Sequence, residues 1–428
     1  MKGKKLLGLL LTVFLVSSLF AGCGKAKNTA ADNSNTQDET KLTGDIEMWS
    51  TFNDNENKVL KEKIIPAFNV KYPGIKVKVT AMPSGDDYKK QILTAGMTGT
   101  TPDLARVDIS DVAQYASQGY LLSVEDLSEF SEIKKNTYEG PMSASYYNGH
   151  YYGIPLDTNT KIAIYNKKLL SSVGYTEAPK TMEEFENLAV KLKAKGIKGI
   201  GIGGVGTWNT LPYYLSLGGK ITNNDATKAT GFLNSAESVK ALEKIVEWNN
   251  NGLIANSLLG GEGTWEGFND EHYAMIDDGP WWYSSNKDQK EVKDNVIFSA
   301  MPKGVGGSIN LVGGEDTMIF KDSKSPKQAW IFAKFLASDE AQTIFASELG
   351  MMPVCKATGE KDVVKNNAVT KVYMEQLNST WARLPHPKWS DISQVIQDAF
   401  ETSIRKASTP QKALDDAASK VDLLLLEK

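Results

Sequence analysis

The stretch 45–82 reads DIEMWSTFNDNENKVLKEKIIPAFNVKYPGIKVKVTAM and contains the pattern that sets the fold class. Residues 45–50 form a short run that predicts a strand, and a polar turn separates it from a helical pattern over 59–74. Residues 75–82 alternate between apolar and polar side chains, which indicates a half-buried strand. Strand, helix and strand in this order predict an α/β unit.

Later segments repeat this alternation of helices and strands. The segment 181–196 has Thr181 and Glu184 at the spacing of a capping box, and Ser325 and Gln328 have the same spacing at the start of 325–345. Short apolar runs between the helices predict strands, namely IKGIGI at 197–202, NVIFSAM at 295–301 and DTMIF at 316–320. We therefore expect an α/β protein with parallel sheets covered by helices.

Size and charge narrow the class of protein. Roughly 385 ordered residues exceed what one hydrophobic core supports, so we expect two domains. The net charge is -4 and no basic stretch suits a phosphate backbone, so nucleic acid is not an expected partner.

The three histidines are far apart in sequence and lack metal-ligand spacing, which argues against a metal site. GIGGVG at 201–206 formally matches a dinucleotide-binding motif, but Pro212 follows where the phosphate-binding helix should run, and we expect no cofactor.

The N-terminal residues have the order of an export signal. MKGKK precedes the apolar run LLGLLLTVFLVSSLF and the small residues before Cys23. The apolar run of about 15 residues is shorter than the roughly 20 that a spanning helix needs. Residues 1–22 are therefore predicted to be a signal peptide that is removed.

Cys23 directly follows a small-residue cleavage site, which resembles the lipobox of bacterial lipoproteins. The resemblance implies an acylated Cys23 that holds the protein at the outer face of the cell membrane; an ordinary secretory signal with an incidental cysteine is the alternative. Gly24 stands where an Asp would retain a lipoprotein on the inner membrane, which favours a Gram-positive setting. Residues 23–43 are predicted to be a lipidated cysteine and a flexible tether, because the segment is polar and lacks aromatics. Cys355 is then left without a partner, so we expect it to be buried and no disulfide to form.

Four blocks in a fixed order resemble the extracellular solute-binding proteins of carbohydrate ABC importers, the class that includes maltose-binding protein. They are TPDLARVD at 101–108, YGIPLDTNTKIAIYNKKLL with GYTEAPKTMEEF over 152–185, FNDEHYAMIDDGPWW at 268–282, and 300–345. The resemblance covers nearly all of the mature chain. It implies a two-lobed periplasmic-binding-protein-like fold with a ligand cleft between discontinuous lobes. Lobe 1 would be 44–157 plus 312–351, and lobe 2 would be 158–311 plus 352–428.

Tryptophans next to polar loops are the first candidates for ligand contact. A sugar ring presents a C–H face that stacks on an indole, while its hydroxyl groups bond to carboxylates, amides and guanidinium groups at the edge. Burying one such face contributes only about 1.5 kcal/mol, whereas micromolar affinity needs about 8 kcal/mol, so several platforms must act together. Five of the nine tryptophans are predicted to be platforms: Trp49, Trp208, Trp265, Trp281 and Trp282.

Polar candidates lie in turns and after predicted strands. Any of them could instead cap a helix or lie in water, and Asp108, Asp157 and Arg383 gain weight from the family resemblance. The full set of polar ligand-binding candidates is Asn53, Asp108, Asp157, Asp278, Gly314, Glu315 and Arg383. Gly314 belongs to a double glycine that lets backbone amides approach a ligand.

The predicted function is therefore capture of a sugar, with an oligosaccharide as the expected ligand, by a monomeric receptor that delivers it to an ABC permease. We expect no catalytic residues, and an ATPase elsewhere would supply the energy. A surface glycoside hydrolase is the alternative, because Asp277 with Asp278, or Asp278 with Glu315, could supply the two carboxylates that such an enzyme needs. A receptor for a non-sugar solute such as a peptide or a polyamine is a further alternative.

Overall fold

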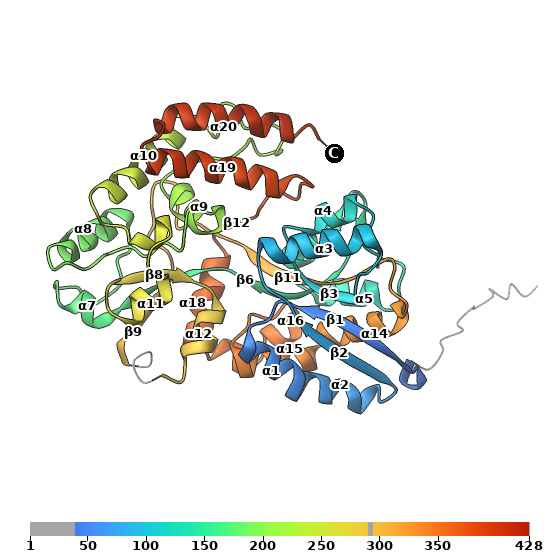
Figure 1. Ribbon diagram of the computed structural model, residues 1–428. Coiled ribbons are helices and arrows are strands. Elements are labelled where there is room, and N and C mark those ends of the chain that lie inside the picture. The colour runs from blue at the N-terminus through green and yellow to red at the C-terminus, as the bar shows by residue number, and fades with distance from the viewer. Residues whose placement is uncertain (1–38, 290–293, 428) are drawn as a thin grey trace, which may run out of the picture. The chain divides into compact units, whose positions relative to one another are not determined.

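Five strands form the larger sheet of the computed structural model, which describes residues 39–289 and 294–427 (Figure 1). The strand order is β2-β1-β3-β11-β6. The strands are β1 (Gly44–Ser50), β2 (Ile75–Ala81), β3 (Leu104–Asp108), β6 (Ile154–Asn159) and β11 (Gly313–Ile319). β1 runs parallel to β2 and β3, and β11 runs antiparallel to β3 and β6. The predicted strands at 45–50, 75–82 and 316–320 are confirmed.

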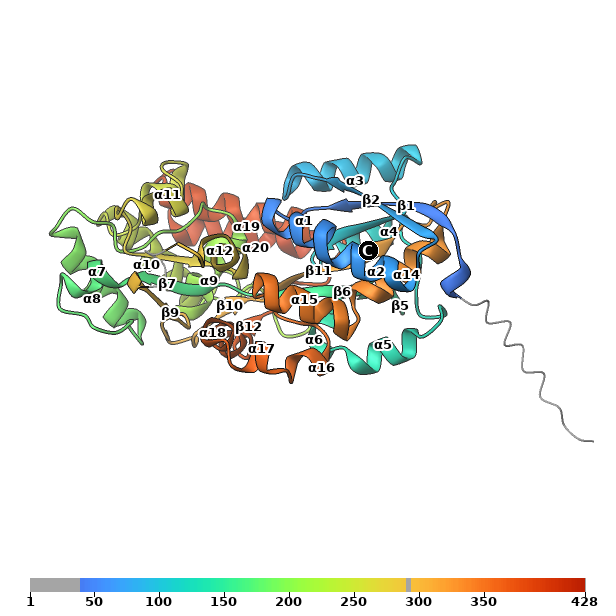
Figure 2. The same cartoon turned by 90° about the horizontal axis from the view of Figure 1, so that it is seen from below.

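Alternating side chains of this sheet enter two different cores. Leu104 and Ile319 face a core with Phe68 and Phe332, whereas Ala105, Val107 and Met318 face the opposite side with Ile92. The helices on the first side are α2 (Ile65–Lys71), α14 (Pro326–Leu336) and α15 (Asp339–Leu349), and α3 (Asp86–Thr98) and α4 (Val112–Ser117) lie on the other side (Figures 1 and 2). Both faces of the sheet are therefore covered, as an α/β protein requires.

The smaller sheet has the order β8-β7-β9, with β7 (Ile162–Asn166), β8 (Met275–Asp278) and β9 (Val296–Ser299). Its strands pair antiparallel, and β11 is antiparallel to both of its neighbours in the larger sheet, so the prediction of parallel sheets holds only for the pairing of β1 with β2 and β3. Ala163 and Tyr165 face the largest core, whereas Ile162 and Ile164 face a small core around Trp282. The two larger cores draw on separate segments of the chain, one on 46–156 with 319–351 and the other on 163–311 with 384–421.

Helices and short strands complete the described part of the chain. The helices are α1 (Asp54–Val59), α5 (Phe130–Asn136), α6 (Glu139–Ala144), α7 (Lys167–Ser171), α8 (Met182–Lys193), α9 (Thr207–Ser216), α10 (Ala236–Asn250), α11 (Thr264–Asn269), α12 (Pro280–Asn286), α16 (Lys356–Gly359), α17 (Asp362–Lys365), α18 (Ala368–Leu377), α19 (Trp389–Ile404) and α20 (Pro410–Leu424). A π-helical segment, η2 (Leu60–Ile64), joins α1 to α2, and η3 (Asn256–Leu259) is a 3-10 helix. Two-residue strands are β4 (Tyr146–Tyr147), β5 (His150–Tyr151), β10 (Asn310–Leu311) and β12 (Thr380–Trp381), and β10 pairs with β12.

Several local predictions need correction. Thr181 caps α8 by accepting a hydrogen bond from the Glu184 amide, but the Glu184 carboxylate accepts from the Lys180 amide instead of completing the box. Ser325 precedes α14 without capping it, because its hydroxyl donates to the Asp45 carbonyl. Residues 197–202 make isolated bridges and not a strand. The expectation that Pro212 interrupts a helix is also wrong, because Pro212 lies inside α9.

The N-terminal predictions lie largely outside the described residues. These are the signal peptide at 1–22, the lipidated Cys23 and residues 24–38 of the tether. Residues Glu39–Lys41 form the 3-10 helix η1, and Glu39 pairs with Lys334 at 2.8 Å, so the folded part begins before Gly44 and the predicted tether is too long by several residues. Among the described residues, none of the helices has the length and apolar character to cross a membrane. Cys355 is buried, as predicted.

Candidate functional site

Arg106 is the centre of a buried charge cluster at the end of β3. Its guanidinium donates to Asp157 Oδ2 on β6 at 3.0 Å and to Glu315 Oε2 on β11 at 2.7 Å. A third contact joins it to Thr51 Oγ1 at 2.8 Å, and its planar group lies 4.3 Å from the Phe52 ring centroid. Burial raises the pKa of Glu315 well above its ordinary value, against the attraction of Arg106. The predicted residues Asp157 and Glu315 therefore share one arginine.

Asn159 connects this cluster to the tryptophan on α9. Its amide donates to Asp157 Oδ1 and to Glu315 Oε2, each at 3.3 Å. A Cβ added to Gly313 would meet Asn159 Oδ1 at 2.2 Å and the Trp208 ring at 2.8 Å, so only glycine fits between them. Gly314 has a φ of 145° and presses against the Asp157 carbonyl, which explains the double glycine by backbone approach within the sheet.

Arg383 joins elements that belong to the two larger cores. It follows β12 and binds Asp108 Oδ1 at the end of β3 at 2.9 Å and Ser110 Oγ at 3.0 Å. Its guanidinium carbon also lies 5.2 Å from the Trp208 ring centroid, and Trp208 packs against the core of the smaller sheet. Burial opposes ionisation of Asp108, but Arg383 and the Ser110 hydrogen bonds outweigh it and lower the pKa of this carboxyl.

A second cation approaches Trp208 from β7's side of the molecule. Lys161 Nζ lies 5.6 Å from the Trp208 ring centroid and forms an ion pair with Asp277 on β8. The Tyr213 hydroxyl donates to Asp277 Oδ1 at 3.1 Å. Two cations, Arg383 and Lys161, therefore lie within 6 Å of the Trp208 ring centroid, and each is paired with a carboxylate.

Asp278 lies at the carboxyl end of β8 and has no cation bound to it in the described part of the chain. It accepts a hydrogen bond from Trp265 Nε1 and one from the Gly279 amide at 2.8 Å. Burial raises the pKa of Asp278 to about 6 despite these donors. The half-buried Trp281 ring folds over its own turn, since a Cβ on Gly279 would lie 2.2 Å from it. Asp278, Trp265 and Trp281 therefore form one group.

Asn53 caps a helix, which is one of the alternatives that the sequence left open for a polar residue in a turn. It caps α1 in a complete capping box with Glu56. It also lines a polar cavity of about 590 Å³ together with Ser284, Lys287 and Asp288 from and after α12, the helix that carries Trp281. Asn53 thus faces the C-terminal part of α12 across this cavity, while its side-chain oxygen is engaged in the cap.

A more apolar cavity of about 460 Å³ borders the charge network. It is lined by Ser110, Asp157 and Arg383, and by apolar side chains such as Val312 and Leu384. The charged side chains and the apolar side chains therefore border the same cavity, at the strands that connect the two larger cores.

Trp282 must be removed from the candidate set. Its side chain is 0% exposed and packs edge-on against Phe268 and Phe298. The reason is the first turn of α12, which sends adjacent side chains in different directions, so that Trp281 stays half-buried while Trp282 fills the core.

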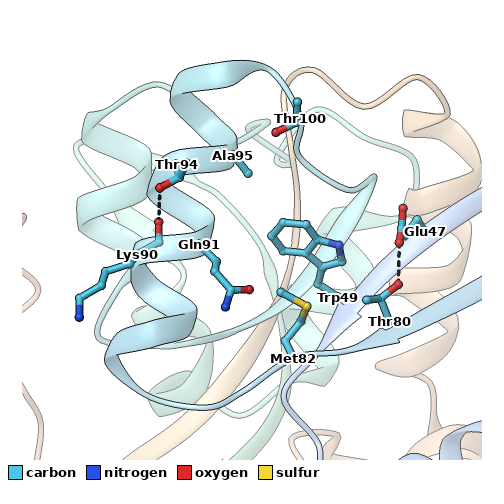
Figure 3. Close-up of a pocket in the computed structure, with 9 residues that line it drawn as sticks. All are labelled: Glu47, Trp49, Thr80, Met82, Lys90, Gln91, Thr94, Ala95 and Thr100. Carbon is cyan, nitrogen blue, oxygen red and sulfur yellow. Dashed lines mark hydrogen bonds between the residues drawn. The ribbon is translucent and has the colours of Figure 1, made fainter.

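Trp49 lies apart from the other candidates. It stands in a cavity of about 580 Å³ between α3 and the strands β1 and β2, where it shares the lining with Gln91 and Met82 (Figure 3). None of the residues of the Arg106, Arg383 or Asp278 groups lines this cavity. The sequence alone did not separate this tryptophan from Trp208, Trp265 and Trp281.

Sequence reasoning missed Arg106, Asn159 and Lys161. A signal was present, because all three are polar residues inside runs that are otherwise buried. A charged or amide side chain in a buried segment needs an ionic or hydrogen-bonding partner, so each of these residues indicated that acidic side chains lie nearby. Glu262, Asp270 and His272 also gather on the surface, with potential ligand atoms within 4.8 Å of one another, and we assign no site to this exposed group.

Comparison with known proteins gives a consistent result. Residues 63–371 match the family model described as bacterial extracellular solute-binding protein. The multiple sugar-binding protein of Streptococcus mutans is 25% identical over 399 residues, which cover 89% of this chain and 90% of the relative.

Solved structures agree on the fold. The GacH receptor of Streptomyces glaucescens, solved without ligand and with acarbose, matches with a TM-score of 0.83 and 22% identity over 90% of this chain and 100% of that chain. Maltose-bound MalE3 of T. maritima matches with a TM-score of 0.80 and 24% identity over 89% of this chain and 99% of that chain. The predicted fold class, a two-lobed α/β fold of the periplasmic-binding-protein type, is confirmed.

Proposed function

Because this chain belongs to the family of bacterial extracellular solute-binding proteins, we propose that it captures a carbohydrate and delivers it to an ABC permease. The family is extracellular, so the protein acts outside the cytoplasm. The sugar-binding function of the Streptococcus mutans relative supports a carbohydrate as the solute. An oligosaccharide is the proposed ligand, since several platforms are needed for useful affinity.

The proposed binding region lies between the carboxyl ends of the two sheets. Asn53 follows β1, Asp108 ends β3, and Asp278 ends β8 with Trp281 shortly behind it. Ligands of open α/β sheets bind outside the carboxyl ends of strands, where loops and helix N-termini converge. We assign 44–157 plus 312–351 to one lobe and 158–311 plus 352–428 to the other, with the ligand bridging them and favouring the closed form.

The observation that carries the proposal is the position of Trp208. Its ring lies near Arg383 and Lys161, and each of these cations is paired with a carboxylate, Asp108 or Asp277. An aromatic face beside fixed donors and acceptors of both signs suits a neutral ring with many hydroxyl groups. A polyamine would instead meet two competing cations.

A binding role is preferred over hydrolysis. A glycosidase needs one carboxylic acid and one free carboxylate on either side of the scissile bond. Asp277 is engaged by Lys161 and Tyr213, and Glu315 is engaged by Arg106 and Asn159. Because both carboxylates that could act together with Asp278 are engaged by other side chains, we propose that the protein is not an enzyme. New reducing ends that appear on incubation with labelled oligosaccharides, and that depend on Asp278, would contradict this.

The protein is proposed to be held at the membrane by an acylated Cys23, with a polar tether before the folded part. Two acyl chains bind a bilayer far more durably than one. Replacing Cys23 with Ser should release the protein into the medium with its sugar affinity intact. Continued retention of the Cys23→Ser protein at the membrane would refute the anchor.

Calorimetry against a panel of sugars that includes maltose and longer oligosaccharides tests the function. Trp281→Ala should abolish most of the binding heat, because the variant loses a platform, while the melting temperature changes little. Trp49→Ala is the matched control, since Trp49 is also half-buried but lies in another cavity, and it should keep the main binding heat. Binding of no sugar in the panel, or equal affinity of Trp281→Ala and the parent protein, would contradict the proposed site.

A further inference from the structure

The cavity around Trp49 lies on a face of the sheet where the cross-strand partners of this tryptophan are small. Trp49 pairs with Thr80 on β2 and with Ala105 on β3, so its neighbours on the same face of the sheet are small. The helix above it, α3, presents Gln91, Thr94 and Ala95 to the same space (Figure 3). An indole normally fills such a gap, but here about 580 Å³ remains beside the half-buried ring. This space is wide open to solvent, so it is a shallow groove that can cover one face of a ligand.

The rim of the cavity carries hydrogen-bonding groups that the protein itself does not use up. Within the described residues, the Gln91 amide makes no hydrogen bond and neither does the Trp49 Nε1–H, whereas Glu47 accepts from Thr80 Oγ1 at 2.6 Å and from Lys78 at 2.9 Å. Those two donors lower the pKa of Glu47 and keep it ionised as an acceptor. Lys90 adds an exposed cation on α3, whose ion pair with Asp87 at 3.5 Å is open to solvent.

We propose that this cavity is a second carbohydrate-binding site, in which one pyranose unit stacks on Trp49 and bonds to Gln91, Glu47 and Lys90. One cation and one anion at the rim suit a neutral, hydroxyl-bearing ring better than a charged solute. The only aromatic side chain of the lining supplies the flat apolar surface that the C–H face of a sugar requires.

Binding at this second site, unlike binding at the proposed main site, needs residues from only one part of the chain. All of its lining residues come from 47–100, so binding there requires no movement between the two larger cores. With a single platform, its dissociation constant should be in the millimolar range. A weak site on the same molecule as a stronger one would keep a saccharide long enough to reach both close to the protein between captures, because the second contact is intramolecular. The ligand class rests on the proposed function, but the residues of the two sites are different.

Fluorine NMR of the full chain labelled with 5-fluorotryptophan separates the two sites. The nine tryptophans give nine resonances, and Trp49→Phe identifies that of Trp49. On titration with maltose to roughly 50 mM, the Trp49 resonance should move in a saturating manner with a millimolar midpoint. It should move in the same way in the Trp281→Ala variant, which keeps this cavity. A Trp49 resonance that stays still in both proteins, or that moves only when Trp281 is present, overturns the second site.

Two variants of α3 sharpen the test. Gln91→Ala should weaken the Trp49 response about threefold to tenfold, because one hydrogen bond to the ligand is lost. Met97→Ala, on the same helix but outside the cavity, should leave the response unchanged. Equal responses in Gln91→Ala and Met97→Ala would contradict the assigned contact. If the resonances of Trp208 and Trp281 stay still while that of Trp49 moves, the proposed main site fails and the second site stands.

Discussion

Arg106 and Arg383 both bind carboxylates at the end of the larger sheet, but they hold together different things. Arg106 is 7% exposed, and its acids lie on neighbouring strands of the same sheet, β6 and β11. The Arg383 side chain is nearly as buried as that of Arg106, at 12% against 9% exposed, but its partner Asp108 at the end of β3 is 37% exposed, and its guanidinium faces Trp208 of the other large core. The first arginine is thus part of a folded unit, and the second connects two units.

The difference shows which ion pairs are available for function. A buried pair inside one sheet cannot separate without exposing uncompensated charge, so it is fixed whenever the sheet is folded. In the pair between the two cores the carboxylate is 37% exposed, so Asp108 can exchange Arg383 for water, and Arg383 can exchange Asp108 for ligand hydroxyl groups, at a smaller cost than in the Arg106 pairs. We therefore expect Arg106 to determine stability and Arg383 to determine binding.

The largest effect is expected from Arg106→Met. The variant leaves Asp157 and Glu315 buried without their cation, and breaking such a pair costs about 3–5 kcal/mol. Urea denaturation should show this loss in the free energy of unfolding. The control is Arg405→Met, which breaks an exposed pair with Glu401 and should change stability by less than about 0.5 kcal/mol. Similar values for the two variants would remove the distinction between buried and exposed arginines.

Asp278 extends the comparison to a buried carboxyl without an arginine partner among the described residues. Its hydrogen-bond donors, the Trp265 indole and the Gly279 amide, are neutral. Its pKa is about 6 in the folded protein and near 3.8 when unfolded, so the folded state holds the proton more tightly. Its contribution to stability is present below pH 3.8 and is lost as the pH rises to 6. Asp278→Asn should therefore gain on the parent protein by roughly 1–3 kcal/mol between pH 4 and pH 6.5. Denaturation curves at several pH values measure this difference, and parallel curves would show that Asp278 does not titrate in this range.

The smallest effect on stability is expected from Arg383→Met. Its partner Asp108 also accepts two hydrogen bonds from Ser110 and can be reached by water, so the loss should be about 1 kcal/mol or less. The affinity for the best sugar of the panel should fall at least about tenfold, because a charged hydrogen-bond donor is lost. Calorimetry and denaturation of the same sample measure both quantities. A loss of stability as large as that of Arg106→Met, with unchanged affinity, would reverse the roles of the two arginines.

Much of the fold could be predicted from local pattern. The alternation in 75–82 marked β2, and the run at 316–320 marked β11. Trp248 and Trp330, which lie in helical patterns, are buried in cores. Side chains repeat every 2 or 3.6 residues along the chain, and this local geometry is visible in sequence.

Pairing between distant segments was not predictable in the same way. The antiparallel arrangement of β7 with β8 and β9 depends on how loops of many residues return the chain, which local periodicity does not encode. The same holds for Ser325, whose hydroxyl binds a carbonyl 280 residues away instead of its own helix.

The same distinction between local sequence pattern and contacts of distant segments applies to the candidate site. The sequence determined by itself that the chain is an α/β protein with tryptophans and acids in polar loops, because residue type and short spacing are local properties. Only the tertiary structure decided that Trp282 is core, that Trp49 stands in a cavity of its own, and that Arg106 rather than Arg383 is locked between Asp157 and Glu315. Burial and charge pairing are set by neighbours far away along the chain, and these neighbours are fixed only when the strands have come together.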